Sequence, residues 1–159
     1  MPLSPIGIAH TIIGSLAVFF GLKMLWQHKQ ITFRSLEGKF YLIATLFTAL
    51  SALTIFKHGG FNPAHALAIL TILATVVGIV IEKTELLKSW NKYAVNLCFS
   101  GTMLFHLIPT ATEILTRFPM GDPIVTSLED PLLQKTFLTI FVLFLAFVIY
   151  QVNWLRKQD

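Results

Sequence analysis

The stretch PAHALAILTILATVVGIVI, residues 63–81, decides the class of fold. It holds 19 residues without an acidic or basic side chain other than one histidine. A helix needs about 20 predominantly apolar residues to cross the hydrocarbon core of a bilayer. Four further apolar segments, residues 6–26, 40–56, 93–115 and 137–154, contain 21, 17, 23 and 18 residues. The sequence therefore predicts an all-α integral membrane protein, a five-helix transmembrane bundle that forms a single domain over residues 1–159.

The composition supports the same class. Only 13% of the 159 residues are charged and 55% are hydrophobic, whereas soluble domains carry about 25% charged residues. Cys98 is the single cysteine, so no intrachain disulfide can form. These features exclude a secreted disulfide scaffold, a nucleic-acid-binding protein and a large soluble catalytic domain. The chain shows no catalytic motif, and we expect no enzymatic activity from it alone, with the lipid bilayer as its first partner.

The positive charges predict an orientation. Cytoplasmic loops carry the excess of lysine and arginine. Of the twelve lysine and arginine residues, nine lie on one predicted side and three on the other. The group of three consists of Lys57, Arg117 and Lys135. This bias predicts an extracytoplasmic N-terminus and a cytoplasmic C-terminus, which requires an odd number of spans. The nine residues predicted on the cytoplasmic side are Lys23, Lys29, Arg34, Lys39, Lys83, Lys88, Lys92, Arg156 and Lys157.

The connections between segments differ in length. Residues 57–62 form a short glycine turn, so the segments on either side are expected to be antiparallel neighbours. Residues 117–136 contain three prolines and predict an irregular extracytoplasmic loop. Segment 40–56 is the shortest and the richest in threonine, which makes it the weakest of the five predicted spans. Glu82 and Glu85 alternate with Lys83 and Lys88, a pattern typical of a solvated helix edge.

Small residues predict where the helices touch. Membrane helices associate through close packing of small side chains and through interhelical hydrogen bonds. The last segment lacks such residues over most of its length, and we expect it to face lipid. The predicted contact rows are Gly14 with Gly21 on the first segment, and Ala44, Thr48 and Ala52 on the second.

Ionisable side chains gather in the predicted outer half of the bilayer. His10, His65 and Glu113 lie near the extracytoplasmic ends of their segments, His106 lies about 10 Å deeper, and His58 is a secondary candidate in the hairpin. Ionisable residues within spans usually face a bundle interior or a cavity. Imidazoles and carboxylates are ligands of iron, copper and zinc, and two apposed imidazoles can hold a haem iron. The candidate cofactors are therefore a b-type haem (heme b) or one of these metal ions.

Simpler interpretations of the same residues are open. His10 and His65 are placed well to be polar anchors at the membrane interface. Glu113 has Arg117 four residues later, an arrangement that gives an ordinary ion pair. His106 is equally well explained by a hydrogen bond to a neighbouring helix. Pro109 removes a helical hydrogen bond three residues after His106 and predicts a kink there.

Three motifs resemble those of a group of uncharacterised bacterial inner-membrane proteins of unknown function. They are His10 with Gly14, the run RSLEGKFY at residues 34–41, and HLIP at residues 106–109 followed by Thr112 and Glu113. The resemblance covers about the first 115 residues. It implies a multi-pass protein of a bacterial cytoplasmic membrane, and it transfers no functional residue.

Three functions follow from these observations. The first is haem or metal binding by the histidines, for electron transfer or metal handling. The second is that of an accessory subunit without chemistry of its own, bound to larger membrane subunits or to further copies of itself. The third is a small oligomeric transporter, which would need a polar path from one side to the other.

Overall fold

A computed structural model describes residues 5–55 and 60–158. The chain is all-helical, with 79% of its residues in helices and no strand in the described part. The five α-helices are α1 (Pro5–His28), α2 (Leu36–Ala52), α3 (Pro63–Thr84), α4 (Asn91–Arg117) and α5 (Pro131–Arg156). A single 3-10 turn, η1 (Lys88–Trp90), precedes α4. The predicted all-α class and the five helices are confirmed.

Capping residues set several helix ends. Ser35 accepts a hydrogen bond from the amide of Gly38 and starts α2 four residues before the apolar segment begins. Asp130 accepts from the amide of Leu132 in the same way, and Pro131 supplies the first residue of α5. Both helices therefore start before the apolar segments that we used to locate them, because a cap is set by hydrogen bonding and a span is recognised by hydrophobicity.

Four helices are long and apolar enough to cross a membrane, namely α1, α3, α4 with η1, and α5. The remaining helix, α2, has 17 residues, or about 25 Å, which is slightly less than the hydrocarbon thickness of a typical bilayer. Four of the five predicted spans are thus supported by helix length and composition.

Helix α2 packs on α1 and α3 and is hydrogen-bonded to α4. It is antiparallel to α1, since Lys23 pairs with Glu37 at one end (Nζ to Oε1, 2.6 Å) and His10 bonds Ser51 at the other (Nδ1 to Oγ, 3.0 Å). It is parallel to α4, because Tyr41 meets Thr102 and Thr45 meets His106 one turn further along both helices. The length of α2 therefore matches the stretch of α1 between residues 10 and 23.

Small residues allow the close approach of these helices. A Cβ added to Gly21 would lie 2.7 Å from the Tyr41 ring and 2.9 Å from Sδ of Met103. A Cβ on Gly14 would lie 3.2 Å from Cγ2 of Thr48. The predicted contact row of α1 is confirmed, as are Ala44 and Thr48 of the row on α2, whereas Ala52 stays a prediction. The hydrophobic core around them consists of Ala17, Met24, Ile31, Tyr41, Leu42, Ala44, Val95, Phe99 and Met103.

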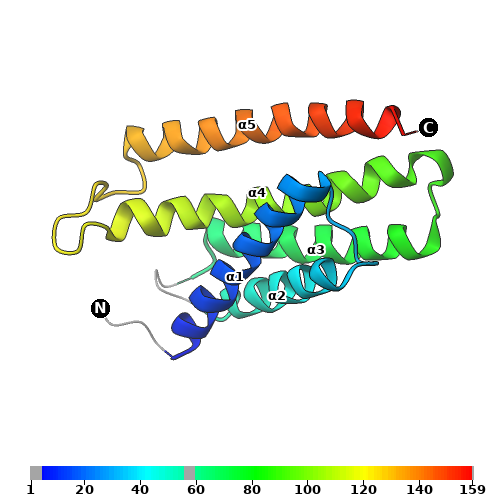
Figure 1. Cartoon of the computed structure of the whole chain (residues 1–159). Coiled ribbons are helices and arrows are strands. Elements are labelled where there is room, and N and C mark those ends of the chain that lie inside the picture. The colour runs from blue at the N-terminus through cyan, green and yellow to red at the C-terminus, as the bar shows by residue number, and fades with distance from the viewer. Residues whose placement is uncertain (1–4, 56–59, 159) are drawn as a thin grey trace.

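Helix α5 stands apart from this core (Figure 1), running along α4 on the side away from α2. Only 6% of its 18 most apolar consecutive residues are buried, against 50% for α4. Its C-terminal part is held by Gln151, which accepts a hydrogen bond from Ser100 (2.9 Å) and donates to the carbonyl of Lys29 (2.6 Å). Helix α5 thus exposes the apolar surface that a lipid-facing helix requires, and its contact with lipid stays a prediction.

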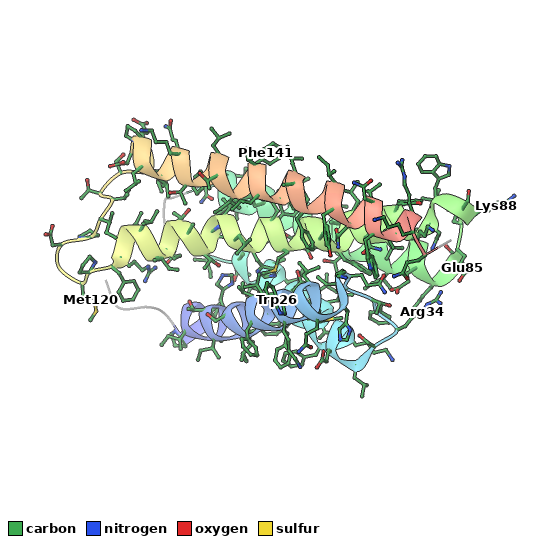
Figure 2. The ribbon with its side chains drawn as sticks, turned by 45° about the horizontal axis from the view of Figure 1, so that its top comes forward. Trp26, Arg34, Glu85, Lys88, Met120 and Phe141 are labelled. Atoms are coloured by element: carbon green, nitrogen blue, oxygen red, sulfur yellow. The ribbon has the colours of Figure 1, made fainter. Side chains whose placement is uncertain are left out.

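The basic residues meet at one end of the bundle. The C-terminal ends of α1, α3 and α5 lie there with the N-terminal ends of α2 and α4, as the labels Arg34, Glu85 and Lys88 show in Figure 2. The ammonium of Lys29 lies over the rings of Tyr150 and Trp154, which joins α1 to α5 at this end. The nine cations predicted on one side are thus grouped together. We call this the basic end of the bundle.

Glu82 corrects one prediction. It is 7% exposed and does not lie on a solvated helix edge. Its carboxylate accepts hydrogen bonds from the hydroxyl of Thr32 and from the amide of Phe33 (2.8 Å), both in the α1–α2 connection. The alternation of charges along the sequence could not reveal this, because the donors come from a segment about 50 residues away. Glu85 is exposed as predicted and pairs with Arg34 (2.8 Å).

The connection between α4 and α5 is irregular, as predicted. Its backbone bends through turns, with the Phe118–Pro119 peptide bond in the cis form. The amide of Val125 donates to the carbonyl of Leu115 (3.0 Å), and the Val125 side chain is buried. The loop is therefore folded back against the end of α4.

Candidate histidine site between α1, α2 and α4

His106 lies in the middle of α4 and points at α2. It is 7% exposed, and its Nε2 is 3.1 Å from the hydroxyl oxygen of Thr45. The ring of Tyr41 lies 6.3 Å away between centroids, tilted against the imidazole. The interpretation of His106 as a hydrogen-bonding partner of a neighbouring helix is confirmed, which leaves open whether it also binds a ligand.

His10 lies on α1 and also contacts α2. Its Nδ1 is 3.0 Å from the hydroxyl of Ser51, and the residue is half-buried. Ser51 donates its own hydroxyl proton to the carbonyl of Thr48 (2.9 Å). Because a hydroxyl has one proton to give, Ser51 must accept from His10, which places a proton on Nδ1 of that ring. The partners of the two rings on α2, Thr45 and Ser51, are six residues apart.

The hydroxyl groups that meet these rings, on Thr45 and Ser51, belong to a row of polar side chains along α2. Tyr41, Thr45 and Thr48 follow each other at four and three residues, so they share a helical face, and Ser51 follows three residues later. Tyr41 donates to Thr102 (2.7 Å), since Thr102 gives its own proton to the carbonyl of Phe99. We call this face, with its partners on α1 and α4, the polar seam. Its members are His10, Tyr41, Thr45, Thr48, Ser51, Thr102 and His106.

Sequence reasoning found the histidines of the seam and missed their partners. Thr48 belongs to a predicted contact row, whereas Thr45 counted only towards the weakness of a predicted span. The spacing of Tyr41, Thr45 and Thr48 is the signal that could have identified a polar helical face. A polar face on a helix flanked by apolar spans indicates a side turned towards other helices, because a hydroxyl that faces lipid can bond only to its own helix.

His65 lies outside the polar seam and caps the start of α3. It is the third residue of α3, 3% exposed, and its Nδ1 accepts a hydrogen bond from the amide of Asn62 (3.2 Å). Asn62 in turn accepts from the amide of Ala64, which completes a capping box at the start of the helix. The ring of Phe61 stacks on the imidazole at 5.6 Å between centroids. His65 is thus part of a helix cap rather than a residue that extends to the membrane surface.

Glu113 forms the ion pair with Arg117 that its spacing predicts, on the exposed last turn of α4. The candidate His58 lies outside the described residues. Among residues 5–55 and 60–158, no three histidine, cysteine, aspartate or glutamate side chains are grouped so that they could hold a metal ion. The described candidates therefore divide into a pair in the polar seam, His10 and His106, and two residues engaged elsewhere, His65 and Glu113.

Pro109 lies inside α4, which runs unbroken from Asn91 to Arg117. Proline leaves the carbonyl of residue 105 without its helical amide. Threonine hydroxyls bond to the neighbouring carbonyls, from Thr110 to His106 (2.7 Å) and from Thr112 to Ile108 (3.0 Å). The predicted kink stays a prediction, and its place is the turn that follows His106.

Comparison with protein-family models, with curated proteins and with solved structures finds no match for this chain.

Proposed function

We propose that this chain is a small multi-pass protein of a bacterial cytoplasmic membrane in which His10 and His106 bind a transition-metal ion, for metal handling or electron transfer. One observation carries the proposal. Two imidazoles from different helices are each held through one ring nitrogen by a hydroxyl of α2. A histidine that ligates a metal usually has its second ring nitrogen hydrogen-bonded, which fixes its tautomer and its orientation.

The packing favours a single ion over a haem. Gly14 brings α1 close to Thr48 of α2 one turn beyond His10, and a macrocycle between these helices would have to separate them. Imidazole suits iron, copper and zinc. The two histidines supply two ligands, and water or a bound molecule would complete the coordination.

The topology that we propose has five spans, with the N-terminus outside and the basic end in the cytoplasm. The excess of lysine and arginine at that end supports this orientation. Helix α2 counts as the fifth span because its contacts match those of α1 from residue 10 to residue 23. The polar seam then lies inside the bilayer, with His10 towards the outer surface.

Elemental analysis tests the metal site. The protein is purified in mild detergent without chelators and without a polyhistidine tag, and iron, copper and zinc are measured. We expect near-stoichiometric metal that falls in His10→Ala and in His106→Gln, the latter chosen because an amide can still bond Thr45. The matched control is His28→Ala, at the exposed end of α1. A folded wild-type protein without metal would refute the proposal, as would equal loss in the control.

A second candidate function is that of an accessory subunit, favoured by the apolar surface of α5. Its exposed side chains Leu138, Phe141, Val142, Leu145 and Ile149 are available to lipid or to a larger subunit. We expect a stoichiometric partner to co-purify from native membranes and to be lost in Leu138→Ala/Leu145→Ala. The control Ile12→Ala/Leu16→Ala removes equally exposed apolar side chains from α1 and should keep the partner. Equal retention in both variants would contradict this function.

A further inference from the structure

At the basic end, a pocket lies between the α1–α2 connection and the last turns of α3. Its lining residues are Phe33, Arg34, Lys39, Glu82 and Lys83. Both acidic groups nearby are engaged. Glu82 accepts from Thr32 and from the amide of Phe33, and Glu85 pairs with Arg34.

Two lysines remain without a carboxylate. The ammonium of Lys83 lies 4.9 Å and that of Lys39 lies 5.9 Å from the centroid of the Phe33 ring. Neither forms an ion pair within the described part of the chain. Two cations are therefore held beside one ring at the lining of the pocket, where an anion would be attracted by both.

The surroundings indicate what kind of anion this is. On α2, Ile43 and Phe47 follow Lys39 at intervals of four residues, and both are exposed. On α3, Val80 and Val76 precede Lys83 at three and seven residues, and both are exposed as well. Each lysine thus stands at the end of an exposed apolar row on its own helix. A phospholipid has a matching order of groups, a charged phosphate followed by acyl chains. Its phosphate would lie at the lysines and its acyl chains along α2 and α3.

We propose that the pocket formed around Phe33 by Lys39 and Lys83 binds the headgroup phosphate of an anionic phospholipid in the cytoplasmic leaflet. Basic pockets between helices on the cytoplasmic side are suited to such headgroups. Glu82 is a positioning residue here, because it fixes the backbone that carries Phe33. The inference rests on the membrane location proposed above and is independent of the metal ion.

Lipid titration of the full chain tests this site. The protein is delipidated in detergent, titrated with phosphatidylglycerol or with phosphatidylcholine of the same acyl chains, and bound lipid is counted by native mass spectrometry. We expect tighter binding of phosphatidylglycerol. In Lys39→Gln/Lys83→Gln its affinity should fall about 25-fold, about fivefold for each lysine, with phosphatidylcholine unaffected.

The matched control is Lys88→Gln/Lys157→Gln, which removes two charges at the same end but outside the pocket. It should retain phosphatidylglycerol binding. Equal loss in both double variants, or no loss in the pocket variant, would overturn the site. Competition by millimolar inorganic phosphate would assign the pocket to a free phosphate instead of a lipid. Failure of the wild-type protein to enter phosphatidylcholine vesicles would refute the membrane location itself, whatever the metal content.

Discussion

Helices α2 and α5 differ in a way that a hydropathy profile does not reveal. Helix α2 is short and carries many hydroxyl groups, yet it packs on α1 and α3, is hydrogen-bonded to α4 and has seven buried residues. Helix α5 is longer, has three buried residues and packs on α4. Among helices that face lipid, hydrophobic surface gives no net drive to associate, so small and polar side chains decide which helix is central. The polar seam therefore joins α2 to α1 and α4, while a hydrophobic core packs around the same three helices.

The largest expected effect comes from closing the space that lets α1 approach α2. In Gly21→Ala the new methyl group would lie 2.7 Å from the fully buried Tyr41 ring. We expect a loss of about 2–3 kcal/mol in the free energy of unfolding, as for other overpacked cores, measured by denaturation in detergent.

Gly101→Ala is its control on α4. No atom lies within 4 Å of a Cβ added there. Because alanine favours helix over glycine, this change should stabilise the protein by about 0.5–1 kcal/mol. An equal loss in the free energy of unfolding in Gly21→Ala and Gly101→Ala would show that the close contact at Gly21 is unimportant.

A second pair of variants compares the seam with α5 directly. Thr45→Val removes the hydroxyl that meets His106 and leaves a buried imidazole nitrogen without that partner. We expect a loss of about 1–2 kcal/mol. Thr139→Val makes the same chemical change on exposed α5, where the hydroxyl bonds the carbonyl of Lys135, and should change stability by less than about 0.5 kcal/mol. Thermal denaturation of both variants checks this, and similar values would remove the distinction between the two helices.

A third variant probes how α5 is attached. Gln151→Leu leaves the hydroxyl of Ser100 and the carbonyl of Lys29 without their shared partner. We expect the free energy that holds α5 against the other helices to fall by about 1 kcal/mol, with no change elsewhere in the bundle. Hydrogen exchange should accelerate in α5 and stay unchanged in α2. Faster exchange throughout would mean that α5 is as integral to the bundle as the seam.

The smallest effect concerns the pair between Lys23 and Glu37 at the basic end. The hydrogen bond from Lys23 lowers the pKa of Glu37 from its ordinary value of 4.5. A lowered pKa in the folded state means that the pair stabilises the protein above that ordinary value and that this contribution is lost as the pH falls through the lower one. The Tm difference between wild type and Glu37→Gln should therefore be small at pH 7 and should shrink in acid. A difference that grew on acidification would contradict the assignment.

Much of the helical framework could be predicted from local sequence. The helix that begins at Pro63 was placed correctly, because Asn62 and Pro63 form a start signal of their own. The second and fifth helices begin four and six residues earlier than the apolar segments suggested. Their caps at Ser35 and Asp130 lie outside the hydrophobic stretches from which a span is recognised.

The candidate site could be predicted only in part. Depth along a helix follows from counting residues, and it placed His10 and His106 in the same half of the bundle. Counting could not separate them from His65 and Glu113, because a cap and an ion pair depend on near neighbours as well as on depth. The partners of the two seam histidines are 41 and 61 residues away along the chain.

The helices, their order and the gathering of charge at one end follow from the order of residues along the chain, because segment length, capping and periodicity are local properties. Which side chains meet across the helices depends on the assembled fold: His106 with Thr45, His10 with Ser51, and Glu82 with the α1–α2 connection. Such contacts depend on how far each helix is rotated and shifted against its neighbours. That rotation and shift are set by the close packing at Gly14, Gly21 and their partners, which takes effect only when the helices are assembled.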